Sequence, residues 1–83
     1  SVVVGNGVNL ISEKAFYTCP NLTSVTISES VTTIASYAFE NCKNLTDVFY
    51  MGTAEQWLNI SINDNNTSLI SATRRYGETE TGV

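Results

Sequence analysis

The stretch "CPNLTSVTISESVTTI" occupies residues 19–34, and the related stretch "CKNLTDVFYMGTAEQW" occupies residues 42–57. Both begin with Cys-X-Asn-Leu-Thr and continue with alternating apolar and polar residues, and then they diverge. The two copies start 23 residues apart. A period of this length is typical of one coil of a solenoid, in which each repeat forms one supersecondary unit.

The same offset relates a longer part of the chain. Nine residues between positions 8 and 27 are identical to the residue 23 positions later: Val8, Ile11, Ala15, Phe16, Cys19, Asn21, Leu22, Thr23 and Val25. Partial copies stand at the ends, "VVVGNGV" from Val2 and "LISATRRY" from Leu69, the last at an interval of 24 residues. The repeat predicts a solenoid over 1–76 and a disordered tail over 77–83. Its parts are a half coil (1–7), two full coils (8–30 and 31–53) and a C-terminal cap (54–76).

Each repeat contains one short strand with a single buried face. Val25 and Ile27 alternate with polar residues, as a half-buried strand requires. Stacked coils place such strands side by side, about 4.8 Å apart, in a parallel sheet. The predicted strands are Val2–Val4, Val25–Ile27, Val48–Tyr50 and Ala72–Arg74.

The repeat also resembles a known family. Cys-X-X-Leu-X-X-Val-X-Ile, followed by Val-X-X-Ile-X-X-X-Ala-Phe, is similar to the BspA-type (Treponema-type) leucine-rich repeat. The signature positions hold Cys19, Leu22, Val25, Ile27, Val31, Ile34, Ala38 and Phe39. The resemblance implies an α/β fold: a short right-handed solenoid, a parallel sheet of about four short strands on one face, short helical turns and a C-terminal capping helix. A mainly-β solenoid is the alternative.

Equivalent residues of successive coils should stack in the core. Phe16 and Phe39 are expected to form an aromatic spine, and Leu22 and Leu45 to fill the core beside them. Cys19 and Cys42 are one coil apart, so their Cα atoms fit a disulfide, but parallel side chains keep the Cβ atoms too far apart. A reduced, buried pair is therefore favoured, and a disulfide remains the alternative. The chain has no histidine to activate a thiol.

The segment "TAEQWLNI", residues 53–60, predicts a short helix. Thr53 and Gln56 have the spacing of a capping box. Trp57 would then close the open end of the core, and stacking of Trp57 on a sugar ring is the alternative. The following "NDNNTS", residues 63–68, predicts a polar turn, because it lacks the spaced acids and final Glu of a calcium loop.

Composition narrows the function classes. The 83 residues are 42% hydrophobic and 14% charged, with four Lys plus Arg and a net charge of −4. Nucleic-acid binding needs a basic surface, and Arg74–Arg75 is the one adjacent basic pair. No apolar run reaches 18 residues, so membrane insertion is not expected. No carboxylate pair, phosphate loop or metal cluster stands out, so the sequence predicts neither an enzyme nor a cofactor or metal site.

A binding face is expected on the sheet. With alternate residues turned inward, Val3, Thr26, Phe49 and Thr73 form an outward row, flanked by Asp47 and Met51. An outward aromatic ring beside a flexible thioether is typical of a hot spot. In the alternative, Phe49 packs against the neighbouring strand or the cap.

The leading hypothesis is a non-catalytic protein-interaction module of a bacterial cell-surface protein. The resemblance implies adhesion to host proteins or other cells, and low charge with many uncharged polar residues fits an extracellular location. The alternatives are a structural spacer or cap, and an accessory domain of a larger exported enzyme. The chain begins within a strand pattern, so we expect a piece of a longer protein whose export signal lies outside it. The unpaired strand Val2–Val4 predicts self-association.

Overall fold

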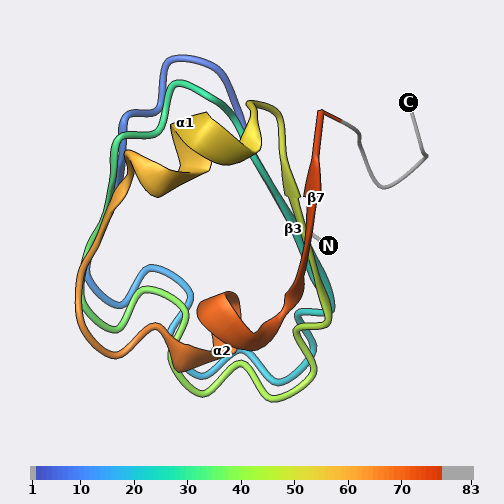
Figure 1. The fold of residues 1–83 in the computed structure, drawn as a ribbon. Coiled ribbons are helices and arrows are strands. Elements are labelled where there is room, and N and C mark those ends of the chain that lie inside the picture. Colours follow the sequence, from blue (N-terminus) through green and yellow to red (C-terminus); the bar gives the residue numbers. More distant parts are fainter. Residues whose placement is uncertain (1, 78–83) are drawn as a thin grey trace.

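The computed structural model describes residues 2–77, and within them the chain winds into stacked coils (Figure 1). Each coil contributes one strand to each of two sheets. The strands are β1 (Val2–Val4), β2 (Leu10–Ile11), β3 (Ser24–Ile27), β4 (Thr33–Ile34), β5 (Asp47–Tyr50), β6 (Ser61–Ile62) and β7 (Thr73–Tyr76). The helices are α1 (Ala54–Leu58) and α2 (Thr67–Ser71).

Both sheets are parallel. The larger one has the order β1-β3-β5-β7 and the smaller one β2-β4-β6. Val3 pairs with Thr26 and Thr26 with Phe49, which is the register that the 23-residue repeat predicts. The expected small α/β leucine-rich-repeat solenoid is therefore confirmed. The second sheet was not predicted, because its strands are two residues long and too short to show alternation.

The last strand differs from its prediction. Ala72–Arg74 was expected as the strand, with Thr73 beside Phe49. In the structure β7 begins at Thr73, which pairs with Asp47, and Arg75 pairs with Phe49. The cause is helix α2, which lies between β6 and β7. A helix rises about 1.5 Å per residue against about 3.3 Å for a strand, so this connection needs more residues.

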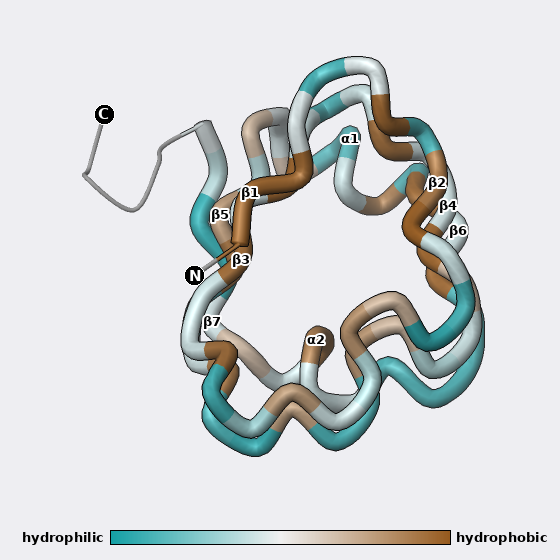
Figure 2. Tube along the Cα trace, turned by 180° about the vertical axis from the view of Figure 1, so that it is seen from behind, coloured by the Kyte–Doolittle hydropathy of each residue, from teal (hydrophilic) through white to brown (hydrophobic). Residues whose placement is uncertain are grey.

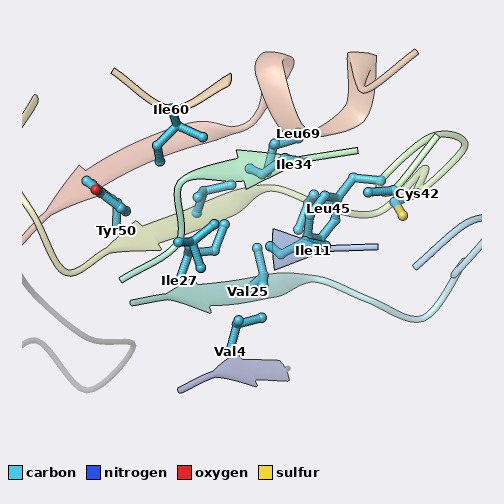
Figure 3. Close-up of a cluster of buried hydrophobic side chains, with 14 of the residues drawn as sticks. Val4, Ile11, Val25, Ile27, Ile34, Cys42, Leu45, Tyr50, Ile60 and Leu69 are labelled. Atoms are coloured by element: carbon cyan, nitrogen blue, oxygen red, sulfur yellow. The ribbon is translucent and has the colours of Figure 1, made fainter. Parts of the chain in front are cut away.

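The core lies between the two sheets (Figure 3). Val25, Ile27, Val48 and Tyr50 enter it from the large sheet and are at most 1% exposed. Other residues join them from the second sheet, the turns and the helices: Ile11, Leu22, Ile34, Phe39, Cys42, Leu45, Trp57 and Leu69. Burying each large apolar side chain contributes about 1.5–3 kcal/mol, so stacking neighbours supply most of the stability.

Two of the expected core residues are only half-buried. Phe16 and Cys19 belong to the first coil and pack against the core from one side. The Phe16 and Phe39 rings stack with centroids 5.0 Å apart and planes 17° from parallel. Both cysteines are free thiols.

The C-terminal end of the solenoid is closed by side chains. Between the first two coils the Phe16 N–H donates to the Ala38 carbonyl at 2.8 Å. One coil later the Phe39 N–H donates instead to Asn66 Oδ1 at 2.8 Å, and the Cys42 N–H donates to Ser68 Oγ at 3.0 Å. Asn66 and Ser68 thus replace the backbone acceptors of a further coil.

The N-terminal end has no such closure among the described residues. Strands β1 and β2 are the edges of their sheets, and apolar residues run along both (Figure 2). At the other end of the chain, Gly77 continues the ladder by donating its N–H to the Tyr50 carbonyl at 2.8 Å. The rest of the expected tail, 78–83, lies outside the described residues.

Candidate functional site

The outer face of the large sheet carries one cross-strand row, formed by Val3, Thr26, Phe49 and Arg75. Their neighbours along each strand point into the core, so these side chains face away from it. Val3 is 73% exposed and Thr26 is half-buried. The row therefore changes from an open apolar residue at one edge to a charged residue at the other.

Phe49 lies in this row but is only 7% exposed. A partner on the outer face could reach little of its ring, so a site on this face cannot depend on Phe49 as an open aromatic surface. Met51 follows directly after β5 and is half-buried, which leaves part of its thioether accessible.

Asp47 and Arg75 form an ion pair at the C-terminal edge of the face. Arg75 Nε lies 3.4 Å from Asp47 Oδ1, and Thr46 Oγ1 donates to Asp47 Oδ2 at 3.0 Å. An exposed pair of this kind contributes less than about 1 kcal/mol to stability. Its main effect is that Asp47 already has a cation beside it. Thr73, which pairs with Asp47, is exposed.

A hollow of about 420 Å³ opens where β1, β3 and β5 end. It is lined by Val3, Val4, Gly5, Asn6, Thr26, Ser28, Glu29 and Met51. Ser28 Oγ donates to Asn6 Oδ1 at 2.7 Å and ties the rim of the hollow to the end of β3. Apolar walls with a few oriented polar groups are typical of binding pockets.

The hollow collects three of the six residues expected to bind: Val3, Thr26 and Met51. Asp47, Phe49 and Thr73 do not line it. The sequence analysis did not single out Asn6 and Glu29, which also line it. Both follow the end of a strand, where loops carry functional groups. That position is the signal that could have found them.

Neither cysteine is a ready nucleophile. Burial raises the pKa of the Cys42 thiol above its ordinary value, and its Sγ donates to the Phe16 carbonyl at 3.0 Å. The thiol is therefore neutral near pH 7, and the thiolate is the reactive form. Within residues 2–77 no three or more of His, Cys, Asp and Glu lie together as a metal site would need.

Trp57 closes the core and does not offer a ring face. It is 4% exposed, its ring meets Tyr50 edge-on at 5.2 Å, and the Arg74 guanidinium lies 4.9 Å from the ring centroid. Stacking on a sugar needs an uncovered ring, so the structure favours the capping role. The capping box of α1 is present as expected, with Thr53 and Gln56 bonded to each other's backbone N–H.

Comparison with known proteins gives one family. The model described as "BspA type Leucine rich repeat region (6 copies)" matches residues 1–73. Neither the curated proteins nor the solved structures give a match. No helix in the described part of the chain has the length and apolar character needed to cross a membrane. Leucine-rich repeats generally serve as non-enzymatic modules that bind proteins, and BspA-type members are typically secreted or surface proteins of bacteria. With the match covering most of its length, this chain belongs to the BspA-type leucine-rich repeat family.

Proposed function

We propose that the chain is the protein-binding part of a bacterial surface or secreted protein and that it holds an extended segment of its partner on the outer face of the large sheet. Adhesion to host proteins or to other cells is the role that the family favours. The observation that carries the proposal is the hollow at the ends of β1, β3 and β5, where the exposed Val3 meets Thr26 and Met51.

The physical support lies in the contrast within this face. A rigid sheet presents its residues without loss of backbone freedom on binding, which lowers the cost of association. The N-terminal part of the face is open and apolar, while the C-terminal part is occupied by the Asp47–Arg75 pair. A segment that covers Val3 and Met51 removes apolar surface from water, which is the main favourable term in association.

The experiment selects peptides from a random phage-displayed library against the whole chain and then measures their affinity for two matched variants. Thr26→Arg places a long charged side chain on the outer face. Thr33→Arg makes the same change at a half-buried threonine of the second sheet. We expect Thr26→Arg to weaken binding at least tenfold and Thr33→Arg to leave it within twofold. Equal effects of the two variants, or no selected peptide, would contradict the proposal.

A structural cap is the second candidate. The side chains of Asn66 and Ser68 end the backbone ladder at the C-terminal end, which is what the last coil of an array requires. This reading expects no peptide whose binding depends on Thr26, so the same selection separates the two candidates.

A further inference from the structure

Glu29 stands at the rim of the hollow, two residues after β3. It is exposed, and within residues 2–77 its carboxylate has no ion-pair partner. It also borders a second hollow, which Tyr50, Gln56 and Ile60 line beside helix α1. Its charge acts on the buried protein beside it, because it adds to the effect of burial in raising the pKa of Tyr50.

Three of the four basic side chains of the protein already have partners elsewhere. Arg75 pairs with Asp47, the Arg74 guanidinium lies 4.9 Å from the Trp57 ring centroid, and Lys14 Nζ lies 5.8 Å from the Tyr17 ring centroid. The chain as a whole carries a net charge of −4. The charge at the hollow is therefore negative and uncompensated by the protein's own cations among the described residues.

The rest of the hollow offers an apolar wall and one oriented amide. Val3 is 73% exposed and Met51 is half-buried, so both can contact a hydrocarbon chain. Asn6 Oδ1 accepts from Ser28 Oγ, which leaves the Asn6 Nδ2 group as a donor for a partner. An apolar stem that ends in a cation is the shape of lysine and arginine side chains, which bury the stem and keep the head polar.

From this geometry we propose that the hollow binds an arginine or lysine side chain of an extended protein segment. The stem lies against Val3 and Met51, the cationic head meets the Glu29 carboxylate, and Asn6 Nδ2 donates to a backbone carbonyl of the segment. Arginine fits better than lysine, since its planar fork can bond a carboxylate through two N–H groups at once. The inference rests on the proposed function and specifies the chemistry of the partner.

The test is a nuclear magnetic resonance titration of the nitrogen-15-labelled chain with acetyl-Thr-Arg-Thr-amide. We expect shifts in the amide signals of Val3, Asn6 and Glu29. An exposed ion pair corresponds to an effect of about two- to fivefold in Kd. Glu29→Gln should weaken binding by that factor, and so should replacing the arginine of the peptide with neutral, isosteric citrulline. In combination the two changes should weaken binding no further than either one alone. Glu13→Gln, at an exposed acid in the turn after β2, is the matched control and should change nothing.

Equal affinity of the native chain and Glu29→Gln would overturn the inference, as would shifts that map away from the hollow or no binding at 10 mM peptide. These outcomes are separate from failure of the proposed function. Library peptides that depend on Thr26 but not on Glu29 would leave the outer face as the binding surface and remove the cation site alone.

Discussion

Asn66 shows how one side chain can replace a coil of backbone. It is 3% exposed and makes three hydrogen bonds: Oδ1 accepts from the Phe39 N–H at 2.8 Å, and Nδ2 donates to the carbonyls of Ala35 and Asn63 at 3.0 Å each. The sequence predicted no more than a polar turn here, because nothing in "NDNNTS" distinguishes a buried Asn from an exposed one.

Asn66→Ala is expected to lower the free energy of unfolding by about 2–4 kcal/mol, because it leaves the buried Phe39 N–H and the Ala35 carbonyl without partners. Urea denaturation followed by circular dichroism measures the change. Asn9→Ala removes an exposed amide with no hydrogen bond among the described residues, and should stay within about 0.5 kcal/mol. A loss below about 1 kcal/mol for Asn66→Ala would contradict the capping role.

Thr18 is a second residue with a clear energetic consequence. Its φ is 52°, in the left-handed region that β-branched residues rarely occupy, and Asn41 has the equivalent conformation one coil later at 62°. Asn tolerates this region better than Thr. Because Thr18 is exposed, little packing is lost on substitution.

Thr18→Asn should therefore stabilise the chain by about 0.5–1 kcal/mol, seen as a higher denaturation midpoint with an unchanged slope. Thr23→Asn makes the same exchange at an exposed threonine outside the left-handed region and should give no gain. A gain of the same size at both positions would mean that the left-handed backbone of Thr18 is not the cause.

At the scale of elements, periodicity predicted what repeats and missed what does not. The strands β1, β3 and β5 and the helix α1 follow from alternation and from the capping box. Helix α2 and the shifted register of β7 did not, because "LISATRRY" matches the repeat in letters while Leu69 packs from a helix. The site behaves alike: alternation placed Val3 and Thr26 on the outer face, but it cannot tell that Phe49 is enclosed or that Glu29 borders a hollow.

The junction of β5 and α1 depends on a close approach at Gly52. A Cβ at this position would lie 2.6 Å from Gln56 Oε1 and 2.7 Å from a ring carbon of Tyr50, which is 1% exposed. Gln56 Oε1 is also the acceptor for the Thr53 N–H in the capping box, at 2.8 Å. Any side chain at Gly52 must therefore disturb both the core and the start of the helix.

Gly52→Ala is expected to destabilise the chain by about 1–3 kcal/mol, the usual cost of overpacking. Thermal unfolding of the variant should show a lower Tm. Gly5→Ala is the matched control: a Cβ there meets nothing within 4 Å, so the Tm should change little. Equal Tm values for Gly52→Ala and the native chain would show that the junction has room for a methyl group.

At the scale of the whole molecule, the two ends of the solenoid differ. The C-terminal end is closed by α1, α2 and the side chains of Asn66 and Ser68. The N-terminal end exposes Val3 at 73%, Leu10 at 50% and Tyr17 at 45%. The Val4 carbonyl accepts from the Ser28 N–H, so Val4 points its backbone groups toward β3. The backbone groups of Val3 then point toward the open edge, since they alternate along a strand.

An open edge beside exposed apolar residues favours pairing with a second copy. Two β1 strands can pair antiparallel about a two-fold axis, because such an interface needs only one self-complementary surface. A head-to-tail contact would instead meet the end that α1, α2 and the side chains of Asn66 and Ser68 close. We therefore expect a dimer that forms reversibly as concentration rises from about 10 μM to 1 mM, the range in which weak interfaces of small area assemble.

Sedimentation equilibrium across that range measures the dimer. Leu10→Lys, at the edge of the second sheet, should raise the dimer Kd at least tenfold, because association would then bury an unpaired charge. Leu58→Lys on α1 makes the same substitution at a residue that is 81% exposed and far from the open edge in sequence, and should leave Kd unchanged. A native chain that stays monomeric at 1 mM would contradict the pairing, and equal effects of the two lysines would place the contact elsewhere.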